Sequence, residues 1–513
     1  MMKCFRRTHL TCSVIVLACL VTSSAAGDGG PEHGDDPHRI SDDAKKYSPK
    51  YSDDRFQRPF FTLDFGHELF KPPGGEALFK RKEGKSGFTG FLEPGATGLE
   101  LTLPTGAVWQ PGFLIFGTYR TALQTFDDGD TKFAEWANRL DIFMEVRLTG
   151  TERLVVGLRP LDQDGRFTSF NLQPKADNDW QEEFNTEITT LFFEGEIAEL
   201  FPKLDVDDFK PLDLGFAVGR QPLVIQEGML INDPIVDAVG IVRNALLPAG
   251  TSNLRLTFQY AWDEINRGNN FRGNNIEDKT AQLWGLFTQL DTKLSTINLD
   301  LAYVDSRVTG DGFYAGLSAV QRIGHLNTSF RALGSFPTSG EVDPEPATEE
   351  EEGRDPREVA QNSRGYLFFG EVSWTPPHTH DLLYFNTFFG IDRFSSAARD
   401  PVTGGPLGRT GILFEAIGLG RYGSPLSNQA DDAYGFSVGY QRLLDKEGRR
   451  QLVGELGGRK ETRGDAKGAA GLAVRYQEAF GKQTVMQLDA FVAAEEQESS
   501  VSYGARIEFR FVF

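Results

Sequence analysis

The last thirteen residues of this 513-residue chain, 501–513, read VSYGARIEFRFVF and alternate between two kinds of side chain. Successive side chains of a β-strand point to opposite faces, so alternate residues share one face. One face would carry Val501, Tyr503, Ala505, Ile507, Phe509, Phe511 and Phe513. The other face would carry Ser502, Gly504, Arg506, Glu508, Arg510 and Val512. The segment therefore predicts a strand with one apolar face and one charged face.

A chain that ends in aromatic alternation resembles the C-terminal signal of bacterial outer-membrane β-barrels. The resemblance implies secretion to the periplasm, insertion into the outer membrane and recognition of this strand by the barrel-assembly machinery. It also implies an outer face in contact with membrane lipid and lipopolysaccharide, a polar lumen and no soluble core.

The same alternation recurs from about residue 111. Between 254 and 262, for example, Leu254, Phe258 and Trp262 fall on one face and Arg255 and Gln259 on the other. A helical period would mix these two sets. We therefore predict an all-β fold, a transmembrane antiparallel β-barrel over residues 111–513 with about 18 strands. The predicted strand centres lie near residues 118, 143, 156, 192, 216, 240, 258, 285, 299, 316, 330, 369, 386, 438, 454, 473, 488 and 506.

The connections between these strands are expected to alternate in length, because outer-membrane barrels have short periplasmic turns and longer external loops. Short turns are predicted at 150–151, 322–324, 376–378 and 481–482. Long external loops are predicted at 161–185, 221–234, 264–278, 337–363 and 394–433. The acidic loop 337–363 is read as a solvated loop, with a pore gate or a divalent-cation contact to lipopolysaccharide as alternatives.

The N-terminus has the pattern of a secretory signal peptide over residues 1–26. Lys3, Arg6 and Arg7 precede a short apolar stretch, and small residues offer a cleavage site before Gly27. Lipoprotein processing at Cys19 is the alternative. Residues 27–110 are expected to form a short irregular N-terminal extension: a flexible periplasmic tail up to about residue 58, then a small extension, a partial plug or early strands.

Composition excludes several classes of protein. All three cysteines lie within residues 1–26, so the mature chain would have no disulfide, thiol nucleophile or cysteine-ligated metal. Signal removal leaves 50 basic and 73 acidic residues, a formal charge of −23 that argues against nucleic acid as a partner. No apolar run elsewhere reaches about 18 residues. Mean hydropathy is −0.34, which is compatible with a barrel because only alternate residues face lipid.

The lumen is expected to carry the charged side chains of the strands. A basic side chain facing lipid at mid-membrane costs about 2–4 kcal/mol, so basic residues within alternating strands should face inward. By phase the inward arginines are Arg147, Arg159, Arg255, Arg331, Arg475, Arg506 and Arg510, with Arg120 less certain. The inward acids are Asp141, Glu145, Asp300, Glu371, Asp489 and Glu508. Two compatible interpretations follow: a charge-balanced wall, or an arginine ladder that attracts anions.

Residues 218–242 read VGRQPLVIQEGMLINDPIVDAVGIV, with Gly219-Arg220-Gln221 leaving one strand and Asp237-Ala238-Val239 entering the next. This hairpin resembles a signature of the alginate-export family of outer-membrane porins. The resemblance implies an 18-stranded barrel with an arginine-rich lumen that passes an anionic polysaccharide such as a polyuronate, or small solutes. Arg220 and Asp237 are the residues it adds to the candidate substrate-binding set.

The leading hypothesis is thus a passive channel for polar, anionic solutes or polysaccharide, without catalytic residues, metal or cofactor. One alternative is a barrel hydrolase, for which His325 is the only histidine near a predicted strand. A surface adhesin acting through the long loops is another. A plugged, energy-coupled transporter would need about 22 strands and a longer chain.

Overall fold

The computed structural model describes residues 95–96, 101–129, 131–163, 165–174, 179–204, 212–267, 277–307, 309–338, 363–445, 448–464, 467–496 and 501–513. The predicted signal peptide, 1–26, and the part of the N-terminal extension up to residue 94 lie outside the described residues. Of the extension, the structure describes three two-residue strands and their turns: β1 (Gly95–Ala96), β2 (Leu101–Thr102) and β3 (Val108–Trp109).

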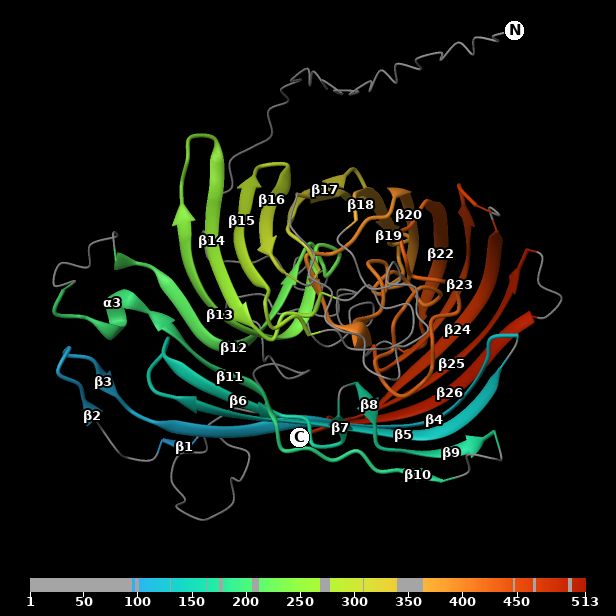
Figure 1. Cartoon of the computed structure of the whole chain (residues 1–513), viewed down its shortest axis with the longest axis horizontal. Helices are drawn as coiled ribbons and strands as arrows, with labels where there is room; N and C mark the ends of the chain where they lie inside the picture. The colour runs from blue at the N-terminus through green and yellow to red at the C-terminus, as the bar shows by residue number, and fades with distance from the viewer. Residues whose placement is uncertain are drawn as a thin grey trace, which may run out of the picture. The chain divides into compact units, whose positions relative to one another are not determined.

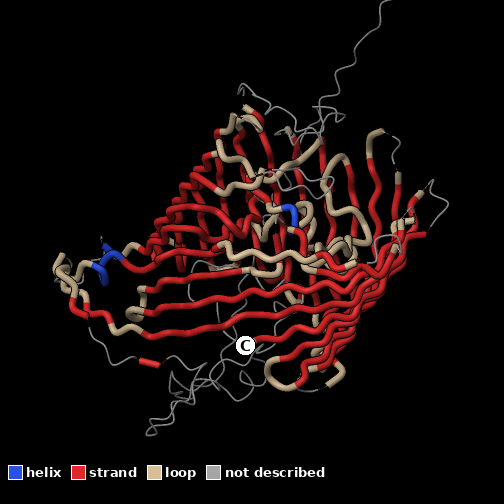
Figure 2. The backbone as a smooth tube through the Cα atoms, turned by 60° about the horizontal axis from the view of Figure 1, so that its bottom comes forward, coloured by secondary structure: helices blue, strands red, loops and turns tan. Residues whose placement is uncertain are grey.

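The described chain from residue 112 onward forms a closed antiparallel barrel (Figures 1 and 2). Its sheet has 22 strands, of which β1 and three other short strands (β9, β10 and β21) are side pieces, leaving eighteen wall strands. These are β4 (Gly112–Asp127), β5 (Lys132–Arg147), β6 (Arg153–Leu158), β11 (Ile188–Glu196), β12 (Gly215–Ile225), β13 (Ile231–Leu246), β14 (Thr251–Asp263), β15 (Gln282–Thr292), β16 (Ser295–Asp305), β17 (Gly312–Ile323), β18 (Leu326–Pro337), β19 (Gly365–Trp374), β20 (Leu382–Asp392), β22 (Ala433–Leu443), β23 (Arg450–Glu461), β24 (Gly468–Phe480), β25 (Thr484–Glu495) and β26 (Val501–Val512). Every predicted strand centre falls within one of them, so the predicted fold and strand number are confirmed.

The C-terminal strand closes the barrel. β26 pairs with β25 on one side and with β4 on the other, from Tyr503 opposite Asp127 to Val512 opposite Thr118. The terminal Phe513 exchanges backbone hydrogen bonds with Gly117. A Cβ on Gly117 would lie 2.8 Å from the Phe513 ring, so position 117, which faces the C-terminal residue, needs a glycine. Closure pairs both edge strands of the sheet. An open edge would leave backbone N–H and C=O groups without partners in the membrane.

The outer face of the wall is apolar and the inner face is polar. On β24, Leu472 and Val474 are 57% and 49% exposed, whereas Ala473 and Arg475 between and beside them are 1% and 6% exposed. Four aromatic residues form a row on the outside of β14 to β16, with ring centres 5.5–6.0 Å apart: Tyr260, Trp262, Trp284 and Tyr303. Such a row is typical of the aromatic girdle of a membrane barrel.

The connections broadly follow the predicted alternation. Short turns join strands at the end where β4 begins and β26 ends, except for a longer connection that starts with the helix α3 (Ile197–Leu200). One loop differs: β12 runs to Ile225 and β13 starts at Ile231, so the predicted loop 221–234 shrinks to 226–230. The predicted loop 161–185 contains β7 (Asp162–Gln163), β8 (Arg166–Phe167), β9 (Ser169–Gln173) and β10 (Trp180–Gln181).

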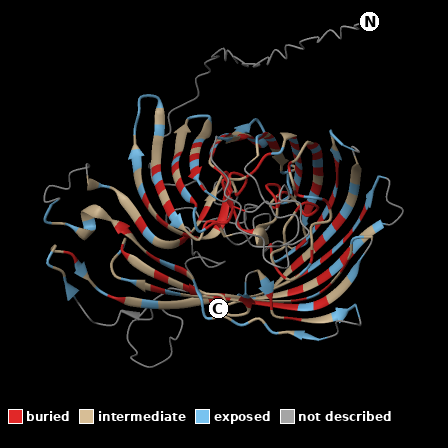
Figure 3. Cartoon of the chain, in the orientation of Figure 1, coloured by how far each residue is buried: buried red, intermediate tan, exposed pale blue. Residues whose placement is uncertain are grey.

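The connection 393–432 does not extend away from the barrel but folds into it (Figure 3). It contains β21 (Ala398–Arg399) and the short helix η5 (Pro401–Thr403). Its Leu407, Leu413 and Phe414 are fully buried and belong to an apolar cluster with inward residues of the wall. The expectation of a polar lumen without a core is therefore corrected, because this long loop buries its apolar side chains inside the barrel.

Candidate functional site

The inward face of the strands around the closure of the barrel carries a group of arginines. We call this group the arginine wall: Arg120 on β4, Arg139 on β5, Arg475 on β24, Arg506 and Arg510 on β26, and Arg159 directly after β6. Arg120, Arg139 and Arg510 are register partners, with Arg510 opposite Arg120 and Arg120 opposite Arg139. Like charges directly opposite one another destabilise a sheet, so this row exists despite an electrostatic cost.

Glu508 offsets the positive charge at one end of this arginine row. It lies one residue along the inward face from Arg510, and its side chain is fully buried. Its carboxylate accepts hydrogen bonds from Arg120 at 2.7 and 3.2 Å and from Arg510 at 3.1 Å. It also forms an ion pair with Arg506. One carboxylate therefore serves three guanidinium groups.

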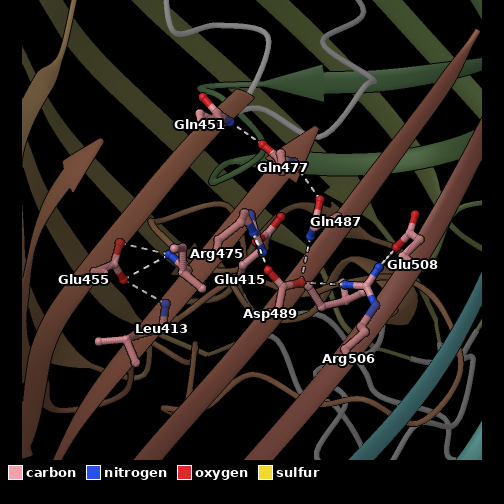
Figure 4. Close-up of polar contacts among 12 residues, drawn as sticks. Leu413, Glu415, Gln451, Glu455, Arg475, Gln477, Gln487, Asp489, Arg506 and Glu508 are labelled. Atoms are coloured by element: carbon pink, nitrogen blue, oxygen red, sulfur yellow. Dashed lines mark hydrogen bonds and ion pairs between the residues drawn. The ribbon is translucent and has the colours of Figure 1, made fainter. Parts of the chain in front are cut away.

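Asp489 and Arg475 form the centre of the wall (Figure 4). They are opposite each other on β25 and β24, and the Arg475 Nε donates to Asp489 at 2.6 Å. Asp489 also accepts from Arg506 Nη1 at 3.2 Å. Both arginines are almost completely buried, and buried charges of this kind require paired partners.

Asp141 offsets the positive charge at the other end of the arginine row. Arg139 binds both of its carboxylate oxygens, at 2.8 and 3.1 Å, and Arg159 donates to it at 3.0 Å. Arg159 also donates to Asp162 at 3.0 Å. Asp162 belongs to β7, in the connection that follows β6. Arg139 was not among the predicted lumen arginines, although it shares the inward phase of the predicted Asp141.

A row of glutamines leads into this centre from the neighbouring strands. Gln441 donates to Gln451 at 2.6 Å, Gln451 donates to Gln477, Gln477 donates to Gln487 at 2.6 Å, and Gln487 donates to Asp489 at 2.7 Å. All four side-chain amides point the same way along the row (Figure 4 shows Gln451 to Asp489). This chain of donors holds the Asp489 carboxylate in the orientation that Arg475 and Arg506 use.

The connection 393–432, which we call the inward loop, contributes residues that no strand pattern could indicate. Glu415 pairs with Arg475 at 2.5 Å. Glu455 on β23 accepts the backbone N–H groups of Ile412 and Leu413 at 2.8–2.9 Å and the hydroxyl of Tyr384. The loop thus reaches the wall through an ion pair and through backbone hydrogen bonds.

The same loop is also held on the far side of the barrel. β21 pairs in parallel with the start of β13, and Arg399 donates to the carbonyl oxygens of Gly404, Gly405 and Gly228. Burial lowers the pKa of the Arg399 guanidinium to about 9, so it stays charged at neutral pH. Together with the contacts to Glu455 and Arg475, these bonds carry the loop across the lumen from β13 to β23 and β24.

Three other predicted lumen arginines lie away from the arginine wall. Arg331 is buried on β18 between Glu227 at 2.6 Å and Glu371 at 2.8 Å. Arg147 is half exposed near the end of β5 and pairs with Glu145 at 2.8 Å. Arg255 lies on β14 in phase with the buried Thr257 and Gln259.

Arg220 and Asp237, the pair added by the family resemblance, lie outside the lumen. They are register partners on β12 and β13, with Nε–Oδ1 at 2.9 Å, and Arg220 also pairs with Glu264 at 2.7 Å. Asp237 stands between Val236 and Ala238, both completely buried, so strand phase places the pair on the outer face. The expectation that they line the lumen is therefore corrected.

The remaining candidate features of the described residues are metal ligands, membrane-spanning helices and a histidine near a strand. The part of the chain that the structure describes holds no group of three His, Cys, Asp or Glu residues able to bind a metal ion. Among the same residues no helix is long and apolar enough to cross a membrane. His325 is exposed in the turn between β17 and β18.

Comparison with known proteins identifies the fold as that of outer-membrane porins. The barrel is similar to OccK2 (OpdF) of Pseudomonas aeruginosa, with 10% sequence identity and a TM-score of 0.50 over 78% of this chain and 97% of that chain. It is also similar to a BenF-like porin from Pseudomonas fluorescens Pf-5, with 10% identity and a TM-score of 0.51 over 78% of this chain and 98% of that chain. No protein-family model matches the sequence. No curated protein matches it in sequence.

Proposed function

We propose that this protein is an outer-membrane channel that lets small polar, anionic solutes cross the membrane passively. The observation that carries the proposal is the row of three opposed arginines across the barrel seam, Arg510, Arg120 and Arg139. A purely structural wall would avoid such a row, because each like-charged pair costs stability. In a lumen, the same row attracts anions, and charged side chains are a usual means of ion selection in pores.

Guanidinium groups favour carboxylate solutes in particular. Their planar fork can bind both oxygens of a carboxylate at once, as Arg139 does with Asp141. The wall has six guanidinium groups and five carboxylates within ion-pair distance of them, the latter being Asp141, Asp162, Glu415, Asp489 and Glu508. This excess of one positive charge supports a preference for anions.

Small solutes are favoured over a polysaccharide. The resemblance to the alginate-export family rests on residues 218–242, and the charged pair of that hairpin faces outward. The loop 393–432 crosses the lumen and packs against both sides of the wall. A polymer would have to pass beside this bridge, whereas a solute of one or two rings needs less room.

The proposed location follows from the polarity of the two faces. The apolar outer face would contact outer-membrane lipid and lipopolysaccharide, after secretion of the chain to the periplasm. Residues 501–513 would be the segment that the barrel-assembly machinery recognises.

Purified protein in a planar lipid bilayer tests the proposal. Discrete conductance steps are expected, and the reversal potential in a KCl gradient should indicate anion preference. A protein that reaches its folded, heat-modifiable state and conducts no ions would refute the channel. Block of the current by oligomeric uronate, without block by single-ring carboxylates, would favour polysaccharide transport instead.

A further inference from the structure

The inward loop lies on the arginine wall with a short stretch, residues 415–421, which we call the covering segment. Two acids of the barrel strands hold the loop just before this segment and at its last residue. On one side Glu455 binds the N–H groups of Ile412 and Leu413. On the other side Glu135 accepts from the backbone N–H of Arg421 at 2.5 Å and from its Nε at 3.2 Å. The segment is therefore placed by the wall itself.

Three consecutive carbonyl oxygens of the covering segment point at wall donors. The carbonyl of Ile417 accepts from Arg120 at 3.2 Å, and that of Gly418 accepts from Arg139 at 3.0 Å. The carbonyl of Leu419 accepts from Gln124 Nε2 at 3.0 Å. Two members of the opposed arginine row are thus occupied by oxygen atoms of the loop.

The close fit depends on glycine. Gly420 has φ of +63°, and a Cβ there would lie 2.3 Å from the Glu135 carboxylate and 2.4 Å from the Gln124 amide. A larger residue would be strained at this φ and would displace the ends of the Glu135 and Gln124 side chains that bind the segment.

Glu415 completes this set of oxygens with a carboxylate. Its side chain is 17% exposed, whereas that of Asp489, the other partner of Arg475, is 4% exposed. Asp489 is fixed on a strand between two arginines and a glutamine. Glu415 comes from the loop and, among the residues that the structure describes, pairs with Arg475 alone, so it is the more easily displaced of the two.

We propose that Glu415 is a tethered counter-ion, which occupies the site where the arginine wall binds the carboxylate of a permeant solute and which that solute displaces from Arg475. The inference rests on the proposed channel function and assigns the recognition site within it. The ligand class is a small carboxylate with further oxygen acceptors, since the covering segment presents one carboxylate and three carbonyl oxygens to the same wall.

Displacement is an exchange of like for like. A solute carboxylate takes over the ion pair that Glu415 leaves, so Arg475 never loses its second partner, and the large cost of a buried unpaired charge is avoided. Glu415 accepts from Arg475 Nη2 through one oxygen, at 2.5 Å. A carboxylate oxygen reproduces this charge-assisted hydrogen bond and brings a second acceptor oxygen, whereas chloride brings none, so the exchange favours carboxylates.

The tether makes Glu415 a competitor of the solute. Even a group on a short flexible linker acts at an effective concentration in the millimolar range, and the anchors at Leu413 and Arg421 hold Glu415 closer to Arg475 than such a linker would. Removal of its charge should therefore lower the apparent dissociation constant of a weakly bound carboxylate by about threefold or more.

The test uses the full chain in planar bilayers, with sodium gluconate as the probe and interruption of the KCl current as the readout. Glu415→Gln should tighten gluconate block by about threefold or more. Glu415→Asp, which keeps the charge, should tighten it less. Arg475→Gln should weaken block. Glu496→Gln is the matched control, because it removes the same charge from an exposed pair with Lys460 outside the wall and should leave block unchanged.

Two results would overturn the inference: unchanged or weaker gluconate block in Glu415→Gln, or equal tightening in Glu496→Gln. Each variant is first checked for the heat-modifiable folded state on gels. If the wild-type protein conducts no ions, the proposed channel fails as a whole. If it conducts and Glu415→Gln behaves like wild type, only the tethered counter-ion fails.

Discussion

Replacing Val474 by arginine tests the orientation of the whole wall. Val474 lies on the outer face of β24, is 49% exposed and is six residues from each end of the strand. At about 3.3 Å per residue, it is about 20 Å along the strand from either end. A tilt of about 45° turns this into a depth of about 14 Å, close to the centre of an apolar band about 25 Å tall.

The expected loss follows from that depth. An arginine facing lipid at the midplane costs about 2–4 kcal/mol of folding free energy, and one near the interface costs about 0–1 kcal/mol. Val501→Arg is the matched control: Val501 is 48% exposed on the same outer face but is the first residue of β26, at the rim. We expect Val474→Arg to destabilise the barrel by about 2 kcal/mol more than Val501→Arg does.

The assay is urea unfolding of protein folded into lipid vesicles, followed by tryptophan fluorescence, with the free energy of unfolding extrapolated to zero urea. Equal losses for the two variants, or a larger loss for Val501→Arg, would refute the assignment of the outer face to membrane lipid. A soluble barrel would show no dependence on depth.

Three further predictions concern the lumen. Arg506→Gln should shift the reversal potential in a KCl gradient toward cations, because it removes a guanidinium beside Asp489; an unshifted potential would contradict an anion-attracting wall. Glu455→Gln should increase current noise, because its carboxylate anchors the loop at Ile412 and Leu413; a trace as quiet as wild type would show that this anchor is dispensable. Burial raises the pKa of Asp431, in the inward loop, to about 6, above its unfolded value of about 3.9. The folded chain therefore binds this proton more tightly, and its contribution to stability is complete below about pH 4 and is lost as pH rises through 6. Asp431→Asn should flatten that part of the unfolding free energy measured from pH 4 to 7, and an unchanged slope would assign it to other groups.

Strand pattern predicted the barrel well because each wall residue has only two possible directions. The phase set by 501–513 placed Arg475, Arg506 and Arg510 correctly on the inward face, together with Asp489 and Glu508. Cross-strand pairing then follows from register, since neighbouring strands are joined by short turns.

Predictions that did not rest on strand phase were less successful. The family resemblance placed Arg220 and Asp237 among the lumen residues, whereas Asp237 lies between two buried residues and the pair therefore faces outward. Residues 394–433 were expected to form an external loop, because long connections of outer-membrane barrels are usually external. Its apolar residues pack inside, a choice that depends on the width of the barrel and not on any local pattern.

By itself the sequence determined the strand number, the part of the C-terminal strand in the wall and the face of the residues in its alternating strands, since an alternating strand has a period of two. Only the tertiary structure decided which charges meet. Arg120 bonds to Glu508, which lies 388 residues away in the chain, and Arg475 bonds to Glu415, which belongs to a loop without periodicity. Those contacts depend on the closed ring and on the path of one loop through it, which are properties of the whole chain.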